Sequence, residues 1–268
     1  MSQVASGPEG MMLKLATWNV NSIRARQGSV LRWLKEESPD VLCIQEIKVE
    51  NELFPCEPFI ENGYSVSVNG QKTWNGVAVL SREEPAEVIR DIPGGSLNQQ
   101  KRVITVRFPG LTIVNVYVPN GGDITLERFR DKLRFLDELK GYIEKLTVRG
   151  SLVVMGDFNV APEADDVYDP ESLEGRICFH SEERSKFRDI ISTGMVDIYR
   201  KFNPVGKAFS WWDYRAASFR RNMGMRLDLI LLNATAAEKA VSCEIQVEPR
   251  KWERPSDHTP VVLLLEDV

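Results

Sequence analysis

Several features that would point to particular classes of protein are missing from this sequence. Its longest uninterrupted apolar stretches, such as Val261–Leu265, fall far short of the roughly 20 residues that a membrane-spanning helix needs. Residues 1–12 carry Gly, Pro and Ser instead of the basic start and apolar run of a secretory signal. We therefore expect a loose tail over residues 1–12 and a cytoplasmic protein with no membrane partner.

Cysteine and histidine are both scarce. The four cysteines are widely spaced and form no C-x-x-C pair, which favours free, buried thiols in a reducing compartment; they are Cys43, Cys56, Cys178 and Cys243. The two histidines are His180 and His258. The chain therefore cannot supply a three-histidine zinc site, and its Cys and His spacings support no other zinc arrangement.

The net charge of −5 argues against a protein that binds nucleic acid through overall basicity, because phosphate contacts usually leave a positive footprint. The average hides a local contrast. Between Asp213 and Asp228, the stretch Arg215–Arg226 carries four arginines and no acidic residue. Such a basic strip beside carboxylates suits a metal-dependent nuclease, in which arginines hold phosphates and carboxylates hold the cation. A solvated charged loop is the alternative.

Short strand-like runs recur along the whole chain. Several are continuously apolar, which is typical of strands buried on both faces. The expected strands in the first half cover residues 13–18, 41–44, 76–80, 102–108 and 111–118. Those in the second half cover residues 152–155, 227–232, 243–247 and 260–265.

Amphipathic stretches between these runs predict helices over about residues 28–37, 126–146 and 182–193. Two strand-rich halves with helices outside them predict a layered α/β sandwich. No linker rich in Pro, Gly or Ser divides the chain, and about 200 to 250 residues is routine for one domain of this kind. We expect a single domain over residues 13–268.

Polar side chains follow the apolar strands at five places, and Asp228 within a strand makes a sixth. One such residue is more often a turn or a helix cap than a catalyst. Six together are more informative, because buried strands fix their ends and would hold these side chains as one rigid group at a sheet edge. The five segments are Trp18–Asn21, Gln45–Lys48, Asn115–Asn120, Gly156–Asn159 and Ser256–Pro260.

This pattern resembles the exonuclease III and abasic-site (AP) endonuclease family, within the DNase I-like phosphodiesterases. The resemblance covers Leu13 to Leu265, and four segments match family motifs almost letter for letter: Trp18–Asn21, Leu42–Glu46, Gly156–Pro162 and Pro255–His258. It implies a DNase I-like fold: a four-layered α/β sandwich in which two packed mixed β-sheets are flanked by helices.

The resemblance also implies a metal site. Glu46 corresponds to the family's metal ligand, Asp257 lies nearby, and Asp157 and Asn159 complete the expected surroundings. Asn21 stands where some relatives carry Asp, which removes one negative charge and leaves the number of bound cations open. Oxygen ligands of this kind suit a hard cation, so we expect Mg²⁺, with Mn²⁺ able to substitute.

Catalytic roles follow from the same motifs. Asp157 corresponds to the residue that orients and deprotonates the attacking water, and Asn159 to one that contacts the phosphate. His258 corresponds to a histidine that points at the scissile phosphate and is held by Asp228. Three further residues match positions that ring the phosphate: Tyr117, Asn19 and Asn120.

Phe209–Arg215 and Asn222–Asp228 resemble the family loop that enters DNA and walls a pocket for a flipped-out sugar. Trp211 and Leu227 match pocket positions, and Met225 replaces a Trp that some relatives carry. The alternative for the adjacent Trp211 and Trp212 is core packing. Three basic residues are expected near DNA: Arg24, Lys48 and Arg215.

Taken together, the resemblance implies a monomeric, Mg²⁺-dependent repair enzyme. It would cut double-stranded DNA 5′ to an abasic site, leave a 3′-hydroxyl, and carry 3′-to-5′ exonuclease and 3′-end-cleaning activities. Sphingomyelinases, inositol-phosphate phosphatases and deadenylases share the same polar core. A phosphodiesterase acting on a lipid or a soluble phosphate ester is therefore the alternative enzyme, and a catalytically silent DNA-binding repair module is the alternative from another class.

Overall fold

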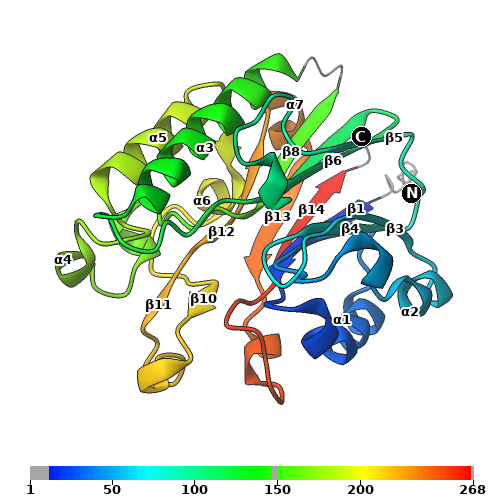
Figure 1. Cartoon of the computed structure of the whole chain (residues 1–268), viewed down its shortest axis with the longest axis horizontal. Helices are drawn as coiled ribbons and strands as arrows, with labels where there is room; N and C mark the ends of the chain where they lie inside the picture. Colours follow the sequence, from blue (N-terminus) through cyan, green and yellow to red (C-terminus); the bar gives the residue numbers. More distant parts are fainter. Residues whose placement is uncertain (1–11, 147–149, 267–268) are drawn as a thin grey trace, which may run out of the picture.

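Two six-stranded mixed sheets pack face to face with helices outside them, as the computed structural model shows (Figure 1). The structure describes residues 12–146 and 150–266. The expected tail lies outside these residues except for Met12, which already belongs to the first strand. No helix in the described part of the chain is both long and apolar enough to cross a membrane.

The first sheet has the order β13-β14-β1-β2-β4-β3. Only β1 and β2 are parallel neighbours in it. Two helices, α1 (Ile23–Glu37) and α2 (Cys56–Glu61), cover its outer face. Its strands are β1 (Met12–Asn19), β2 (Val41–Gln45), β3 (Ser65–Asn69), β4 (Val77–Ser81), β13 (Ala240–Ile245) and β14 (Val261–Glu266).

The second sheet has the order β5-β6-β7-β8-β12-β9, with β7 and β8 parallel. Helices α3 (Glu127–Lys145) and α5 (Ser181–Ile191) cover its outer face. Its strands are β5 (Glu87–Arg90), β6 (Val103–Phe108), β7 (Leu111–Tyr117), β8 (Ser151–Asp157), β9 (Val196–Asp197) and β12 (Asp228–Leu232).

Shorter elements complete the chain. A two-stranded ribbon, β10 (Trp211–Trp212) and β11 (Gly224–Met225), projects beyond the sheets. The remaining helices are α4 (Pro170–Leu173), α6 (Ile198–Phe202) and α7 (Ala234–Lys239), with 3₁₀ turns at Asn51–Leu53, Asn98–Gln100, Ala164–Asp166, Arg215–Ala217 and Glu248–Lys251.

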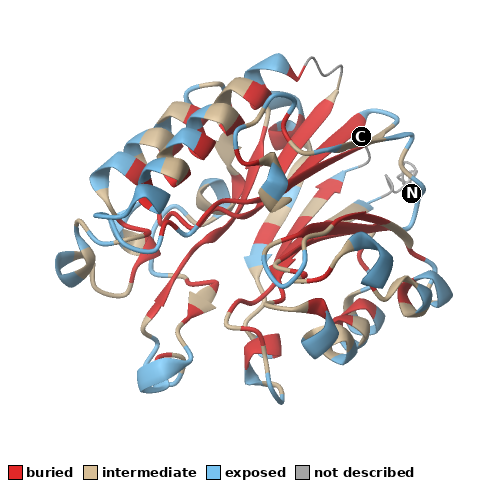
Figure 2. Ribbon diagram, viewed as in Figure 1, coloured by how far each residue is buried: buried red, intermediate tan, exposed pale blue. Residues whose placement is uncertain are grey.

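The central strands are buried on both faces, which explains their continuous apolar runs (Figure 2). In β8, Val153 and Met155 face the core between the sheets, whereas Leu152 and Val154 face α3 and α5. The predicted four-layered sandwich of two mixed sheets flanked by helices is confirmed. Helix α1 begins at Ile23, earlier than expected, because this buried side chain adds a turn to its apolar face.

The strand directions bring the polar segments to one edge of the sandwich. Strands β1, β2, β7 and β8 end there. Strand β12 runs antiparallel to β8, so that Asp228 begins it directly opposite Asp157. Strand β14 likewise begins at Val261, opposite Thr17 of β1.

The four cysteines are free thiols, as expected. Three of them are buried, but Cys56 at the start of α2 is only partly buried, which corrects the expectation for that residue.

Candidate active site

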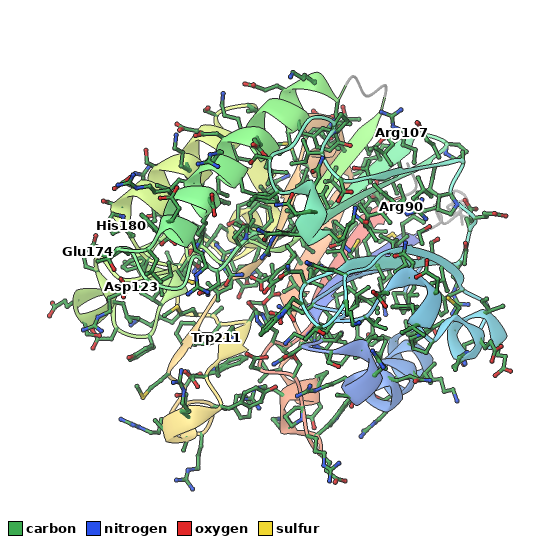
Figure 3. The ribbon with its side chains drawn as sticks, viewed as in Figure 1. Arg90, Arg107, Asp123, Glu174, His180 and Trp211 are labelled. Atoms are coloured by element: carbon green, nitrogen blue, oxygen red, sulfur yellow. The ribbon has the colours of Figure 1, made fainter. Side chains whose placement is uncertain are left out.

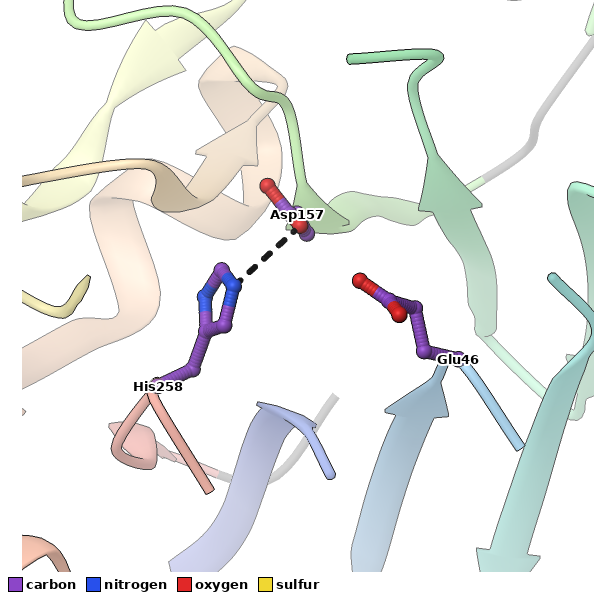
Figure 4. Close-up of side chains that lie close together, drawn as sticks. All are labelled: Glu46, Asp157 and His258. Atoms are coloured by element: carbon purple, nitrogen blue, oxygen red, sulfur yellow. Dashed lines mark ion pairs between the residues drawn. The ribbon is translucent and has the colours of Figure 1, made fainter. Parts of the chain in front are cut away.

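One buried amide joins the acidic residues of the two sheets. Asn19, at the end of β1, donates through Nδ2 to Glu46 Oε1 and to Asp157 Oδ2, both at 2.9 Å. Figure 4 shows Glu46, Asp157 and His258 facing a common point, each from a different chain segment. The structure thus brings together side chains separated by more than two hundred positions in the sequence.

Three of the site residues have left-handed backbones immediately after their strands. The φ angles of Asn21, Glu46 and Asn159 are 47°, 52° and 49°. Asn tolerates this conformation, but for Glu46 it costs on the order of 1 kcal/mol. The Ser22 N–H donates to the Glu46 carbonyl at 2.7 Å and holds the turn. This local strain directs the Glu46 side chain to the site.

His258 lies between two carboxylates. Its Nδ1 is 2.8 Å from Asp228 Oδ2, and its Nε2 is 3.7 Å from Asp157 Oδ2. Burial opposes the charged imidazolium, but Asp228 and Asp157 outweigh it and raise the pKa of His258 to about 10. The ring is therefore protonated at neutral pH in the metal-free protein. Ser210 Oγ accepts the Asp228 N–H at 3.0 Å and fixes that strand end.

The two carboxylates that accept from Asn19, those of Glu46 and Asp157, differ in proton affinity. Burial, together with Asp228 and Glu46, raises the pKa of Asp157 to about 7 although His258 opposes the shift. Burial also favours the neutral form of Glu46, but the Lys48 ammonium, 2.9 Å from Oε2, and the Asn19 amide leave its pKa below the ordinary value. Asp157 is therefore poised near neutral pH as a base, while Glu46 stays ionised.

The acidic end of the site can accept a cation. Glu46, Asp157 and His258 each offer one ligand atom, and these atoms lie within 4.8 Å of one another. Because His258 is protonated and engaged with Asp228, the available donors are mainly oxygens, which fit a hard divalent cation.

Two residues of the expected metal site lie beside this cluster and are joined to each other. Asp257 Oδ1 accepts from Asn21 Nδ2 at 2.9 Å. Burial raises the pKa of Asp257, but the charge of His258 and hydrogen bonds from Asn21 and Trp211 outweigh it and leave that pKa below its ordinary value. Asp257 is therefore a carboxylate at neutral pH. That Asn21 and Asp257 ligate a metal stays a prediction.

Neutral hydrogen-bonding side chains also line the site. Asn120 Nδ2 donates to Asn159 Oδ1 at 3.1 Å, and Asn159 Nδ2 donates to the Val118 carbonyl at 3.0 Å. Burial and the charge of Glu46 hold the pKa of Tyr117 well above its ordinary value, so its phenol keeps its proton. The Arg102 guanidinium stacks 4.7 Å from the Tyr117 ring centroid.

A cavity of about 280 Å³ opens from this cluster. Its lining combines the polar cluster with an apolar wall that includes Trp211 and Met225, which pair with each other across the β10–β11 ribbon. Its lining residues are Glu46, Tyr117, Asn120, Asp157, Asn159, Ile177, Cys178, Trp211, Met225, Leu227, Asp257 and His258.

Three predicted DNA contacts lie outside the cavity lining. Arg24 is exposed in the first turn of α1. Arg215 has a side chain that is 88% exposed and paired with Asp213 at 2.7 Å. Lys48 is paired with Glu46.

The expectation of an exposed basic strip over Arg215–Arg226 is partly wrong, because Arg226 is fully buried. Its guanidinium pairs with Asp166 at 2.6 Å and with Asp197 at 2.7 Å, so it joins the ribbon to the second sheet and cannot hold DNA phosphate. Trp212 is also a core residue, packed edge-on against Phe219 at 5.1 Å. Trp211, in contrast, lines the cavity and is labelled in Figure 3.

Sequence reasoning missed several residues around the site. Ser210 accepts the Asp228 N–H and Arg102 stacks on Tyr117, but nothing in their sequence context distinguishes them. Ile177 and Cys178 line the cavity from an irregular segment. Trp74, 66% exposed, lies on the β3–β4 loop. The carbonyl of its neighbour Asn75 accepts the Lys48 N–H at 2.9 Å, which connects this loop to the site. An aromatic residue in a polar turn was the sequence signal that could have identified Trp74.

Comparisons with known proteins agree with this geometry. The model of the Endonuclease/Exonuclease/phosphatase family matches residues 16–258. The chain is 36% identical to exodeoxyribonuclease III of Haemophilus influenzae, over 93% of this chain and 98% of that protein.

Two solved structures are similar over nearly their whole length. An AP endonuclease from Archaeoglobus fulgidus has a TM-score of 0.91 at 41% identity, over 96% of this chain and 100% of that chain. A 3′ phosphatase from Neisseria, bound to a product DNA hairpin, has a TM-score of 0.92 at 36% identity, over 94% and 98% of the two chains.

Proposed function

Because the chain belongs to the Endonuclease/Exonuclease/phosphatase family, and within it to the exodeoxyribonuclease III and AP endonuclease group, we propose that it is a magnesium-dependent DNA repair nuclease. Its main reaction is hydrolysis of the phosphodiester 5′ to an abasic site in double-stranded DNA, which leaves a 3′-hydroxyl. Exonuclease action from 3′ ends and removal of 3′ blocking groups accompany it.

The strongest support for this proposal is a cavity lined by both charged and apolar side chains. Glu46, Asp157 and His258 line this cavity together with Trp211 and Leu227, so charged groups and apolar side chains face the same space. Hydrolysis of a phosphodiester needs the charged groups, and a sugar without a base fits against the apolar side chains. An inorganic or highly charged substrate has no use for the apolar wall.

Glu46 would hold the metal, with Asp157, Asn159, Asn21 and Asp257 around it. When bound, Mg²⁺ neutralises charge on the phosphate oxygens and supplies ordered water. The ammonium of Lys48 pairs with Glu46 at 2.9 Å, and it would be free to contact a DNA phosphate if a cation replaced it as the partner of Glu46.

The chain's own residues account for the hydrolytic step. Asp157, with a pKa of about 7, accepts the proton of the attacking water. The water oxygen bonds to phosphorus and the bond from phosphorus to the 3′-oxygen breaks. The leaving oxygen becomes the 3′-hydroxyl by taking a proton from solvent water, and the proton on Asp157 returns to solvent.

His258, protonated and held by Asp228, is the charged donor for the negative charge that develops on the phosphoryl oxygens. The Asn159 amide donates to the Val118 carbonyl and to Asp157 Oδ2, so it and the Asn120 amide bonded to it would meet the phosphate by exchanging these partners. Tyr117 adds a neutral phenol. Asn19 keeps the two carboxylates apart and oriented.

DNA would lie across the edge of the sandwich. Exposed Arg24 and Arg215, and Lys48 once released, supply phosphate contacts. Trp74 beside the site offers an aromatic face for the duplex. Met225 and Trp211 would enter as part of the β10–β11 ribbon and shelter the extruded sugar.

The relatives support the same choice of substrate, since one is named for exonuclease activity, one for AP sites, and one was solved with a DNA product. We further propose that the protein acts in the cytoplasm at the chromosome, as a monomer, with residues 13–268 as one domain.

A substrate panel tests this proposal. The protein is incubated, with and without Mg²⁺, with a duplex carrying one abasic analogue, the matched intact duplex, a sphingomyelin vesicle and a soluble inositol phosphate. We expect Mg²⁺-dependent cutting of the abasic duplex at least about tenfold faster than internal cutting of the intact one. Turnover of the lipid or soluble ester alone would identify the alternative enzyme, and DNA binding with no turnover would identify a silent binding module.

A further inference from the structure

A fully buried ion pair lies directly behind the asparagines of the site. Lys132 on α3 and Glu183 on α5 are both completely shielded from solvent and are joined through Nζ and Oε1. Lys132 occupies the apolar stripe of its helix, between Phe129 and Phe135. A lysine at such a position requires an explanation beyond packing.

The ammonium of Lys132 uses all three of its N–H donors. One goes to Glu183, one to the Asn159 carbonyl at 2.6 Å, and one to the Asn120 carbonyl at 3.2 Å. These two asparagines are also joined to each other through their side chains. Lys132 therefore holds the main chain of both residues from behind the cavity.

Glu183 extends the same connection to the cavity wall. Its Oε1 accepts the Cys178 N–H at 3.2 Å, and its Oε2 accepts the His180 N–H at 2.9 Å. Cys178 lines the cavity. The pair thus links three loops: the one after β7, the one after β8, and the one before α5.

Folding stability alone does not explain why a buried ion pair stands at this position. Replacing a buried ion pair by apolar side chains is often neutral or stabilising, because desolvating two charges costs several kcal/mol. The carbonyls of Asn159 and Asn120, in contrast, both accept from this one ammonium, so the pair fixes the main chain of two cavity residues relative to each other. A charged donor gives these carbonyls stronger bonds than a neutral one would.

We propose that Lys132 and Glu183 are positioning residues, which hold Asn159 and Asn120 in the geometry that meets the phosphate during hydrolysis. This inference rests on the proposed phosphodiesterase function. Neither residue touches the substrate, so their effect must pass through Asn159 and Asn120. Loss of the pair should lower kcat and leave KM for DNA nearly unchanged.

The test compares Lys132→Met, the charge-neutral double variant Lys132→Met/Glu183→Gln, and Lys186→Met. The last is a matched control, because Lys186 pairs with Asp137 between the same two helices but on the surface, at 2.8 Å. For each variant kcat and KM are measured on the abasic duplex with Mg²⁺, and the rate is also measured on bis-p-nitrophenyl phosphate. Circular dichroism during heating monitors folding.

We expect kcat to fall about tenfold or more in both Lys132 variants, KM to change less than about threefold, and Lys186→Met to stay within about twofold of the wild type. In an Asn159→Ala background, Lys132→Met should lower kcat by less than about threefold, because the residue it positions is gone. The slow hydrolysis of the small diester should fall with kcat.

Three outcomes would overturn the inference. The first is a folded double variant with wild-type kcat, and the second is an equal loss of kcat from Lys132→Met in the wild-type and Asn159→Ala backgrounds. The third is failure of both Lys132 variants to fold, which would make the pair purely structural. Failure of the proposed function is recognised separately. In that case the wild-type protein would not cut the abasic duplex, whatever the variants do to the small diester.

Discussion

Trp211 donates its indole N–H to Asp257 Oδ2 at 3.0 Å. The apolar wall of the cavity is thereby fixed to the acidic end by one hydrogen bond. The backbone of Trp211 also forms a bridge to His258. The positions of the apolar wall and of the polar residues are therefore mechanically connected.

Changing Trp211 to Ala should reduce kcat/KM on an abasic duplex by roughly tenfold or more, equivalent to about 1.4 kcal/mol or above. Cutting at a recessed 3′ end should fall less, because an apolar wall matters most when a baseless sugar fills it. Trp211→Phe keeps the wall and loses the hydrogen bond to Asp257, so it should retain more of the preference. Equal loss of both activities in folded Trp211→Ala would remove this residue from the sugar pocket.

Glu46→Gln should weaken the use of Mg²⁺ more than the binding of DNA. The amide keeps the shape of the side chain but removes the charge that attracts a hard cation. We expect activity to return in part at high Mg²⁺, with the half-saturating concentration raised about tenfold or more. Glu52→Gln, on an exposed 3₁₀ turn, is the control. A magnesium titration that matches the wild type would show that Glu46 is not a ligand.

Asp157→Asn and His258→Ala should each lower kcat by at least about a hundredfold, as expected for a positioned base and a charged donor. Binding of the abasic duplex, measured by fluorescence anisotropy without metal, should persist. His180→Asn is the matched control, since the other histidine caps α5 and packs against Phe129, outside the cavity lining, and Asn preserves the cap. Near-normal turnover in either site variant would exclude that residue from the mechanism.

The pKa of His258 gives a prediction that needs no substrate. Asp228→Asn removes the largest cause that raises it, so the pKa should fall from about 10 toward the ordinary value of 6.5. With two histidines in the chain, side-chain NMR resolves the titration of the metal-free protein. Asp213→Asn, on the exposed loop, should leave it unchanged. An unaltered His258 titration in Asp228→Asn would contradict the proposed pairing.

The same shift has a consequence for stability. Because the folded pKa of His258 lies above its ordinary value of 6.5, its protonation contributes stability that is fully present below about pH 6.5 and is lost as the pH rises through about 10. Asp228→Asn should reduce this contribution, so the difference in melting temperature from the wild type should be larger at pH 6 than at pH 10.

Sequence reasoning succeeded where a local pattern determines the structure. The apolar runs of β2, β7 and β8 identify strands buried on both faces, and the polar residues that follow them must then meet at one edge. Asn19, Glu46 and Asp157 were recognised in this way. Five strands were missed: β3, β5, β9, β10 and β11. The last three have two residues each, too few for a periodicity to appear, and β3 and β5 lack the continuous apolar run of the central strands.

Burial of charged residues could not be predicted from the sequence. Lysine and arginine usually lie on the surface, so Lys132 and Arg226 gave no signal of their own. Their burial depends on Glu183 and Asp166, which are 51 and 60 positions away. The exposed basic strip was therefore overestimated, and the connection behind Asn159 was not foreseen.

The central claim is that this sheet edge is a Mg²⁺-dependent centre that cuts beside a missing base. The most direct measurement is end mapping of a duplex with one abasic analogue, labelled in turn at each end of the damaged strand, over a Mg²⁺ titration. We predict one cut, immediately 5′ to the analogue, with a 3′-hydroxyl that a DNA polymerase extends, and no cut when a chelator is present. Cutting that persists without metal, that falls 3′ to the analogue, or that ignores the analogue would contradict it.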